Sequence, residues 1–181
     1  MDASMTFTEQ LRKLSQNILE KISQTLMVLG ISANVVTLFG FLGSLVVAAL
    51  VATGNFLASG IVLACVSPLD AIDGTLARLK GNTTNFGAFF DSITDRYSEL
   101  VIFLGFAIFY LKQWDVLGVV LSFIASAGSV LVSYARARAE GINIELKEGI
   151  LTRVERYLVL MLGLLFQVPK VALWIIAILA N

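Results

Sequence analysis

Residues 22–69 read ISQTLMVLGISANVVTLFGFLGSLVVAALVATGNFLASGIVLACVSPL and contain no aspartate, glutamate, lysine or arginine. A membrane-spanning helix needs about 20 mostly apolar residues, so this stretch is long enough for two spans. Of the 181 residues in the chain, 57% are hydrophobic and only 14% are charged. Soluble domains have roughly 45–50% apolar residues. The sequence therefore predicts an all-α integral membrane protein folded as one helical bundle.

Turn and breaker residues divide this bundle into six predicted transmembrane helices, which begin near Ala33, Leu57, Asn85, Val116, Gly149 and Pro169. The second is expected to continue past Pro68 as far as Lys80. From Pro169 only 13 residues remain, which as a helix reach about 20 Å and fall short of a hydrocarbon layer of about 30 Å. We expect the sixth helix to be short because the natural chain is longer. A re-entrant end is the alternative.

The N-terminal segment, residues 1–28, is predicted to form an amphipathic helix on the membrane surface, ahead of a transmembrane domain over residues 29–181. Thr6 and Glu9 have the spacing of a capping box. Apolar residues follow at helical intervals, at Phe7, Leu11, Leu14, Ile18 and Ile22. Headgroups and water would solvate the opposite face. Packing against a partner protein is the alternative.

The basic residues are distributed unevenly between the two sides that this topology defines. Eleven of them fall on one side, and that side is cytoplasmic by the positive-inside rule. These are Arg12, Lys13, Lys21, Arg78, Lys80, Arg96, Arg136, Arg138, Lys147, Arg153 and Arg156. Only Lys112 and Lys170 fall on the other side. The chain is thus expected in the cell membrane, with its functional groups facing the cytoplasm.

Four aspartates stand at the cytoplasmic ends of the second and third predicted helices. Asp70 and Asp73 are three residues apart, and Asp91 and Asp95 are four apart, so each pair shares one helical face. An ionised carboxylate near the bilayer is costly unless a cation, a partner or a reaction uses it. Two neighbouring helices could aim the four carboxylates into one space. Ion pairs with Arg78 and Arg96 that merely hold the bundle together are the structural alternative.

The chain has no histidine and a single cysteine, Cys65, so oxygen ligands alone are available for a metal. Such a ligand set favours Mg²⁺, Mn²⁺ or Ca²⁺ over Zn²⁺. Two divalent ions a few ångströms apart can clamp a pyrophosphate and stabilise charge during displacement at phosphorus. One aspartate could instead be spared from metal ligation to act as a base.

Residues 70–95, DAIDGTLARLKGNTTNFGAFFDSITD, follow the pattern D-x2-D-G-x2-A-R-x8-G-x3-D-x3-D. This pattern resembles the signature of the CDP-alcohol phosphatidyltransferases, and the predicted layout of helices is similar to that family over nearly the whole chain. The resemblance implies that Asp70, Asp73 and Asp91 ligate two Mg²⁺ or Mn²⁺ ions, with Asp95 as a further ligand or as the catalytic base. It also implies a binding site for the cytidine diphosphate of the donor. That site would comprise Gly74, Ala77, Arg78 and Gly87.

A cluster of arginines lies on the same predicted side as the aspartates: Arg136, Arg138, Arg153 and Arg156. Guanidinium groups bind phosphate bidentately, so the cluster suits a second, anionic substrate. Positive charge at cytoplasmic helix ends is the purely topological explanation. The segments SYARARAEG and TRVER resemble the branch of the family that makes phosphatidylinositol phosphate or archaetidylinositol phosphate. That resemblance implies that the arginines bind the phosphate of the acceptor.

These observations predict a membrane enzyme that transfers a phosphatidyl or archaetidyl group from a CDP-linked lipid to inositol 1-phosphate and releases CMP. Glycerol 3-phosphate, as used by a phosphatidylglycerophosphate synthase, is the alternative acceptor. A cation transporter or channel lined by the aspartates is the alternative from another class. Glycines at Gly105, Gly118, Gly128 and Gly163 would allow close helix packing or a homodimer. No nucleic-acid partner is expected.

Overall fold

A computed structural model describes residues 7–81, 84–144 and 151–180, with side chains from Gln16 onward except that of Asn17. The described residues form helices only. Their bounds are α1 (Phe7–Val28), α2 (Ala33–Ala52), α3 (Phe56–Val66), α4 (Pro68–Leu79), α5 (Asn85–Lys112), α6 (Val116–Glu140), α7 (Arg153–Leu165) and α8 (Pro169–Leu179). Thr6, Lys147 and Gly149, which the sequence analysis singled out, lie outside the described residues. The all-α prediction is confirmed.

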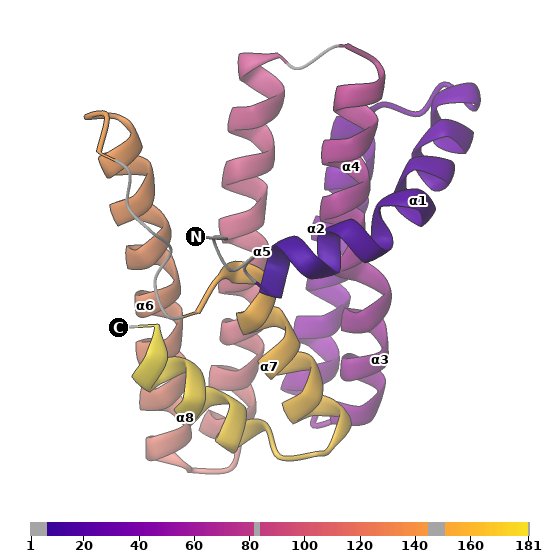
Figure 1. The fold of residues 1–181 in the computed structure, drawn as a ribbon. Helices are drawn as coiled ribbons and strands as arrows, with labels where there is room; N and C mark the ends of the chain where they lie inside the picture. Colours follow the sequence, from indigo (N-terminus) through magenta and orange to yellow (C-terminus); the bar gives the residue numbers. More distant parts are fainter. Residues whose placement is uncertain (1–6, 82–83, 145–150, 181) are drawn as a thin grey trace.

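The helices alternate in direction between two ends of the bundle (Figure 1). The turns that follow α2, α5 and α7 lie together at one end, and the end of α4 and the start of α5 lie at the other. Three helical stretches are long and apolar enough to cross a membrane: Ala33–Ala52, Phe56–Leu79 and Val116–Glu140. The last helix, Pro169–Leu179, is apolar and shorter than these three stretches.

The second predicted span is helical from Phe56 to Leu79, with a turn at Ser67, in helical backbone conformation, between α3 and α4. Proline has no backbone N–H and its ring crowds the preceding turn, so it breaks the hydrogen-bond ladder there. The hydroxyl of Ser67 donates to the carbonyl of Leu63 at 2.7 Å. Asp70 lies in the first turn of α4.

The main hydrophobic core lies between α2, α3, α5, α6, α7 and α8. Its largest fully buried side chains include Phe103 and Phe106 of α5, Leu121 of α6 and Leu173 of α8. Large apolar side chains such as Phe39, Leu104 and Phe123 are exposed on the outside of the same helices. An apolar outer surface around a packed core is expected for helices that face lipid.

Helices α2 and α5 approach each other closely at Gly105. A Cβ atom at this position would lie 2.5 Å from the carbonyl oxygen and 2.9 Å from the Cα of Ala48. Only a residue without a side chain fits between these two backbones. The close approach fixes α5, which carries Asp91 and Asp95, against α2.

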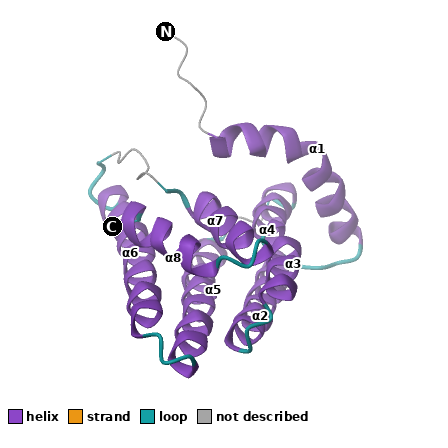
Figure 2. Cartoon of the chain, turned by 90° about the horizontal axis from the view of Figure 1, so that it is seen from below, coloured by secondary structure: helices purple, strands orange, loops and turns teal. Residues whose placement is uncertain are grey.

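Helix α1 lies outside the bundle formed by the other helices and contacts it at α4 (Figure 2). The buried hydroxyl of Ser23 donates to the carbonyl of Ile72 at 3.2 Å. A small apolar cluster of Val36, Ile72 and Leu76 packs with partly buried side chains of α1 at the same place. Gly30, at φ +76°, ends the helix and turns the chain toward α2. This contact attaches α1 next to the aspartates of α4.

Candidate active site

Three of the four predicted aspartates are brought together by α4 and α5. Carboxylate oxygens of Asp70, Asp91 and Asp95 all lie within 4.8 Å of one another. The turn of α4 that follows Pro68 supplies the first, and the other two lie one turn apart on the facing side of α5. Such a cluster of hard oxygen donors suits a divalent metal ion.

Asp73, the fourth aspartate, is not part of this group of three and is held by α2. Its side chain is buried, with 4% exposed, and Oδ2 accepts a hydrogen bond from the hydroxyl of Thr37 at 2.6 Å. A threonine in an apolar helix gave no sign of this role in the sequence. Its contact with Asp73 joins residues 36 positions apart and becomes visible only in the folded chain.

Arg153, at the start of α7, forms ion pairs with two of the clustered aspartates. Its Nη1 atom donates to Oδ1 of Asp70 at 2.8 Å and to Oδ2 of Asp95. The guanidinium also lies over the ring of Tyr157, 5.3 Å from the centroid. The sequence predicts that this arginine binds the phosphate of the acceptor, and its contact with the carboxylates is visible only in the folded chain.

Arg153 alone does not balance the negative charge of the carboxylate cluster. Oδ1 of Asp91 is buried without a hydrogen-bond partner among the described residues, whereas buried polar atoms are almost always satisfied. Three acidic groups close together also repel one another unless positive charge is added. The residues present therefore fit a divalent cation at this position.

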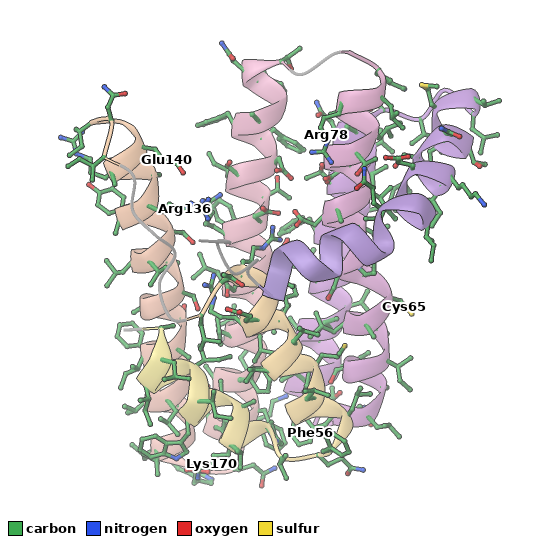
Figure 3. All side chains as sticks on the ribbon, viewed as in Figure 1. Phe56, Cys65, Arg78, Arg136, Glu140 and Lys170 are labelled. Atoms are coloured by element: carbon green, nitrogen blue, oxygen red, sulfur yellow. The ribbon has the colours of Figure 1, made fainter. Side chains whose placement is uncertain are left out.

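The residues predicted to bind the cytidine diphosphate lie on α4 and near the start of α5, and none of them lines the two cavities described below. The half-buried Gly74 and Ala77 are on α4, as is Arg78, whose exposed side chain extends from α4 on the side that faces α5 (Figure 3). Its Nη2 atom donates to the hydroxyl of Thr75 at 3.0 Å. A Cβ atom on Gly87 would lie 3.1 Å from Oγ1 of Thr84 and 3.6 Å from Oδ1 of Asn34. Asn34 of α2 is thus a polar neighbour of Gly87 that the sequence analysis did not include.

A cavity of about 540 Å³ opens beside the aspartates, between α5, α6 and the start of α7. Arg136, Arg153 and Arg156 line it, together with Ser133 and Asp95. In Figure 3 Arg136 extends from α6 toward α5, and its Nε atom lies 3.2 Å from Oε1 of Glu140. Arg138, the fourth arginine of the predicted cluster, is exposed at the end of α6 and is not among the lining residues. The cavity thus gathers three of the four predicted arginines.

Arg156 is the most deeply buried of these arginines, with 1% exposed. Its Nε and Nη2 atoms donate to the two carboxylate oxygens of Glu99, at 2.7 and 3.0 Å, and its Nη1 atom donates to the carbonyl of Leu151 at 3.1 Å. Glu99 lies one turn after Asp95 on α5 and was missed by the sequence analysis. In the sequence, Glu99 is a single acidic residue at the edge of an apolar stretch, and such a residue indicates a buried partner or a functional site.

A second, smaller cavity of about 120 Å³ lies on the other side of Arg153. It reaches from Asp70, Asp73 and Asp95 to apolar side chains of α2, α3 and α7, such as Phe41, Val66 and Met161. Arg153 and Asp95 line both cavities. Asp95 therefore lies between an apolar cavity and a cavity lined by arginines.

An all-helical bundle with apolar spans and clustered carboxylates at one end defines a membrane enzyme of the metal-dependent kind. Residues 30–180 match the CDP-alcohol phosphatidyltransferase family, and the chain belongs to that family. The resemblance found in residues 70–95 is confirmed. The chain is accordingly an enzyme, and the alternative of a cation transporter or channel is not supported.

Individual relatives point to one branch of the family. The chain is 40% identical over 163 residues to an archaetidylinositol phosphate synthase of Pyrococcus horikoshii, covering 90% of this chain and 84% of the relative. It is 30% identical over 176 residues to a phosphatidylinositol phosphate synthase of Mycobacteroides abscessus, covering 92% and 80%.

Solved structures of one enzyme also match. The structure of Mycobacterium tuberculosis phosphatidylinositol phosphate synthase with CDP-DAG bound has a TM-score of 0.82 at 27% identity, covering 91% of this chain and 88% of that one. The complex of the same enzyme with manganese and citrate has a TM-score of 0.79 at 26% identity, covering 90% and 83%. That complex and the aspartate cluster of this chain both support use of a divalent metal.

Proposed function

We propose that this enzyme transfers a phosphatidyl or archaetidyl group from a CDP-linked lipid to inositol 1-phosphate, with release of CMP. The observation that carries the proposal is the polar cavity of about 540 Å³, lined by Arg136, Arg153 and Arg156, directly beside the aspartate cluster. An acceptor that carries its own phosphate explains why basic side chains gather there. The names of the relatives agree with this acceptor.

The donor is proposed to bind with its diphosphate at the aspartates and its nucleotide near Gly74, Ala77, Arg78 and Gly87. The cavity lined by Phe41, Val66 and Met161 offers the lipid tails an apolar path from the bilayer. Two Mg²⁺ or Mn²⁺ ions held by Asp70, Asp73, Asp91 and Asp95 would neutralise the diphosphate and stabilise the charge that develops at phosphorus. Thr37 would orient Asp73 for this role.

Asp95 is proposed as the catalytic base because it lines both the donor cavity and the acceptor cavity. Its carboxylate would take the proton from the acceptor hydroxyl as that oxygen attacks the lipid-linked phosphorus. The new oxygen–phosphorus bond forms while the bond to CMP breaks, so the lipid passes to the acceptor in one displacement. Arg136 and Arg153 would hold the phosphate that does not react.

For the membrane arrangement we propose six spans, formed by α2, by α3 with α4, by α5, α6 and α7, and by the short α8. Residues 1–28 would lie on the cytoplasmic surface, and residues 29–181 would form the catalytic domain. The end of the bundle that carries Arg78, Arg136 and Arg153 would face the cytoplasm, because Lys112 and Lys170 are the basic residues at the opposite end. A homodimer is compatible with the exposed apolar faces.

An acceptor panel tests the proposal. The purified protein is incubated with Mg²⁺ and either CDP-diacylglycerol or its archaetidyl counterpart, and CMP release is measured with inositol 1-phosphate, glycerol 3-phosphate, serine or free inositol. We expect release only with inositol 1-phosphate, and none from the Asp91→Asn variant. Asp115→Asn, at the opposite end of the bundle, serves as the matched control. Release with glycerol 3-phosphate alone would contradict the acceptor assignment.

A further inference from the structure

Arg153 makes contacts that belong to two different sites. Its Nη1 atom has two N–H bonds, and these point at Asp70 Oδ1 and Asp95 Oδ2. Both aspartates belong to the cluster whose oxygens lie within 4.8 Å of one another. The same side chain lines the polar cavity of about 540 Å³ that Arg136 also lines. The guanidinium cannot bind the carboxylates and a phosphate in that cavity with the same N–H bonds.

The contact with the carboxylates competes directly with a metal ion. A divalent cation held by Asp70, Asp91 and Asp95 would share the carboxylates that now accept from Arg153 and would neutralise the charge that attracts it. It would also place two positive charges beside the guanidinium and repel it. Binding of the ion therefore removes the attraction that holds Arg153 in its present position.

The surroundings of Arg153 allow its side chain to move while its backbone stays in place. The start of α7 is held by a capping box in which Thr152 Oγ1 accepts from Glu155 N at 3.3 Å and Glu155 Oε2 accepts from Thr152 N at 2.6 Å. The side chain of Arg153 is 29% exposed, whereas that of Arg156, three residues later, is 2% exposed and paired with Glu99. Of these two arginines, only Arg153 has room to change partners.

We infer that Arg153 couples the two substrate sites: its guanidinium occupies the carboxylates until a divalent cation displaces it, and it then turns into the polar cavity to bind the acceptor phosphate. The inference rests on the proposed function for the identity of that phosphate. Coupling of this kind is reciprocal, so the cation tightens acceptor binding and the acceptor tightens cation binding by the same factor. The acceptor site is then completed only after the metal has bound.

Direct measurement of Mn²⁺ binding by electron paramagnetic resonance tests the competition without any turnover. The full chain in detergent micelles, free of CDP-lipid, is titrated as the wild type, Arg153→Ala and Arg153→Gln. Loss of the competing guanidinium should tighten Mn²⁺ binding by about five-fold or more, the lower end of typical coupling between sites. Unchanged or weaker binding in both variants would overturn the inference.

Arg96→Ala is the matched control, because it removes the same charge next to Asp95. Arg96 donates to the backbone carbonyl of Ser92 at 2.5 Å, so its loss changes the field near the carboxylates and leaves the ion pairs of Arg153 in place. We expect its Mn²⁺ affinity to change by less than about two-fold. A tightening equal to that of Arg153→Ala would show a general charge effect and contradict the competition.

A second measurement on the wild type decides the question if the Arg153 variants do not fold. Inositol 1-phosphate binding is compared in the presence of Mn²⁺ and after its removal by a chelator, and we expect an affinity about five-fold or more higher with the metal. Equal affinities would overturn the coupling. A wild type that releases CMP with inositol 1-phosphate but shows no coupling contradicts this inference alone. A wild type that shows the coupling but releases no CMP contradicts the proposed function alone.

Discussion

Glu99 and Arg156 place two opposite charges inside the bundle, with two hydrogen bonds between them. Removing both charges from water costs several kcal/mol, and their attraction offsets that cost only while both are present. The pair therefore contributes less to stability than its geometry suggests, and each partner depends strongly on the other. Arg156 thus has a structural role as the partner of Glu99. This role is distinct from the acceptor binding that the sequence predicts for Arg156.

Replacing Arg156 alone by alanine should lower stability by about 3–5 kcal/mol, because Glu99 is left charged and unpaired in the core. The double variant Glu99→Leu with Arg156→Met should recover most of this loss. Thermal unfolding in detergent micelles measures both effects, and Lys112→Ala, an exposed charge at the other end, should stay within about 0.5 kcal/mol of the wild type. If the stable double variant keeps the wild-type acceptor KM, Arg156 does not bind the acceptor.

Thr37→Val should lower turnover about ten-fold and lower stability by about 1.5–3 kcal/mol. Valine has nearly the same shape but cannot donate the hydrogen bond to Asp73, and a hydrogen bond to a charged group contributes about 1.5–3 kcal/mol. CMP release and the unfolding midpoint are measured together. Thr25→Val is the control, because the Thr25 hydroxyl donates only within its own helix, to Lys21 at 3.0 Å. Full activity in Thr37→Val would show that Asp73 needs no orientation from α2.

The sequence predicted that the aspartates share helical faces, and the structure brings Asp70, Asp91 and Asp95 together, whereas the partners of these side chains were not predicted. The spacing within residues 70–95 follows from helix periodicity, so the shared face of Asp91 and Asp95 could be derived locally. Thr37, Glu99 and the second set of contacts made by Arg153 depend on side chains between 36 and 83 positions apart. These contacts depend on how the helices pack against one another, and helix periodicity does not determine that packing.

At the scale of the helices, α2 and α5 meet backbone to backbone at Gly105. Gly105→Ala should destabilise the protein by about 1–3 kcal/mol, because the new methyl group meets backbone atoms of Ala48 that cannot rotate away. Gly40→Ala is the matched control, since its Cβ would lie 3.8 Å from Leu69 Cβ, an ordinary contact. Unfolding midpoints of the two variants give the comparison. Equal midpoints would show that α2 and α5 can separate without cost.

The ends of most helices were predictable, since they coincide with breakers that can be read from the sequence. Gly30 and Gly81 have positive φ angles at the ends of α1 and α4, as glycine after a helix predicts. The start of α7 was placed near Gly149, but the helix begins at Arg153, after the cap Thr152. The pattern T-R-V-E at 152–155 carried that signal and was not used. The turn between α3 and α4 falls at Pro68, which has no backbone N–H to continue the hydrogen-bond ladder.

At the scale of the whole molecule, the two ends of the bundle differ in charge, and the side of the membrane that each faces can be measured. Single cysteines are introduced as Trp114→Cys, in the turn after α5 where Trp114 is 91% exposed, and as Arg138→Cys, at the end of α6. Both are made in a Cys65→Ser background. An impermeant maleimide should label the first in sealed spheroplasts and the second only after permeabilisation. Labelling of Arg138→Cys in sealed spheroplasts would reverse the proposed orientation.

The attachment of α1 has a mechanical consequence. Its only described hydrogen bond to the bundle, from Ser23 to the carbonyl of Ile72, meets the backbone one residue before Asp73. Under the proposed topology α1 rests on the headgroups, and its tilt would act through this contact on the turn of α4 that carries Asp73. Surface pressure and lipid charge would then shift the position of this carboxylate.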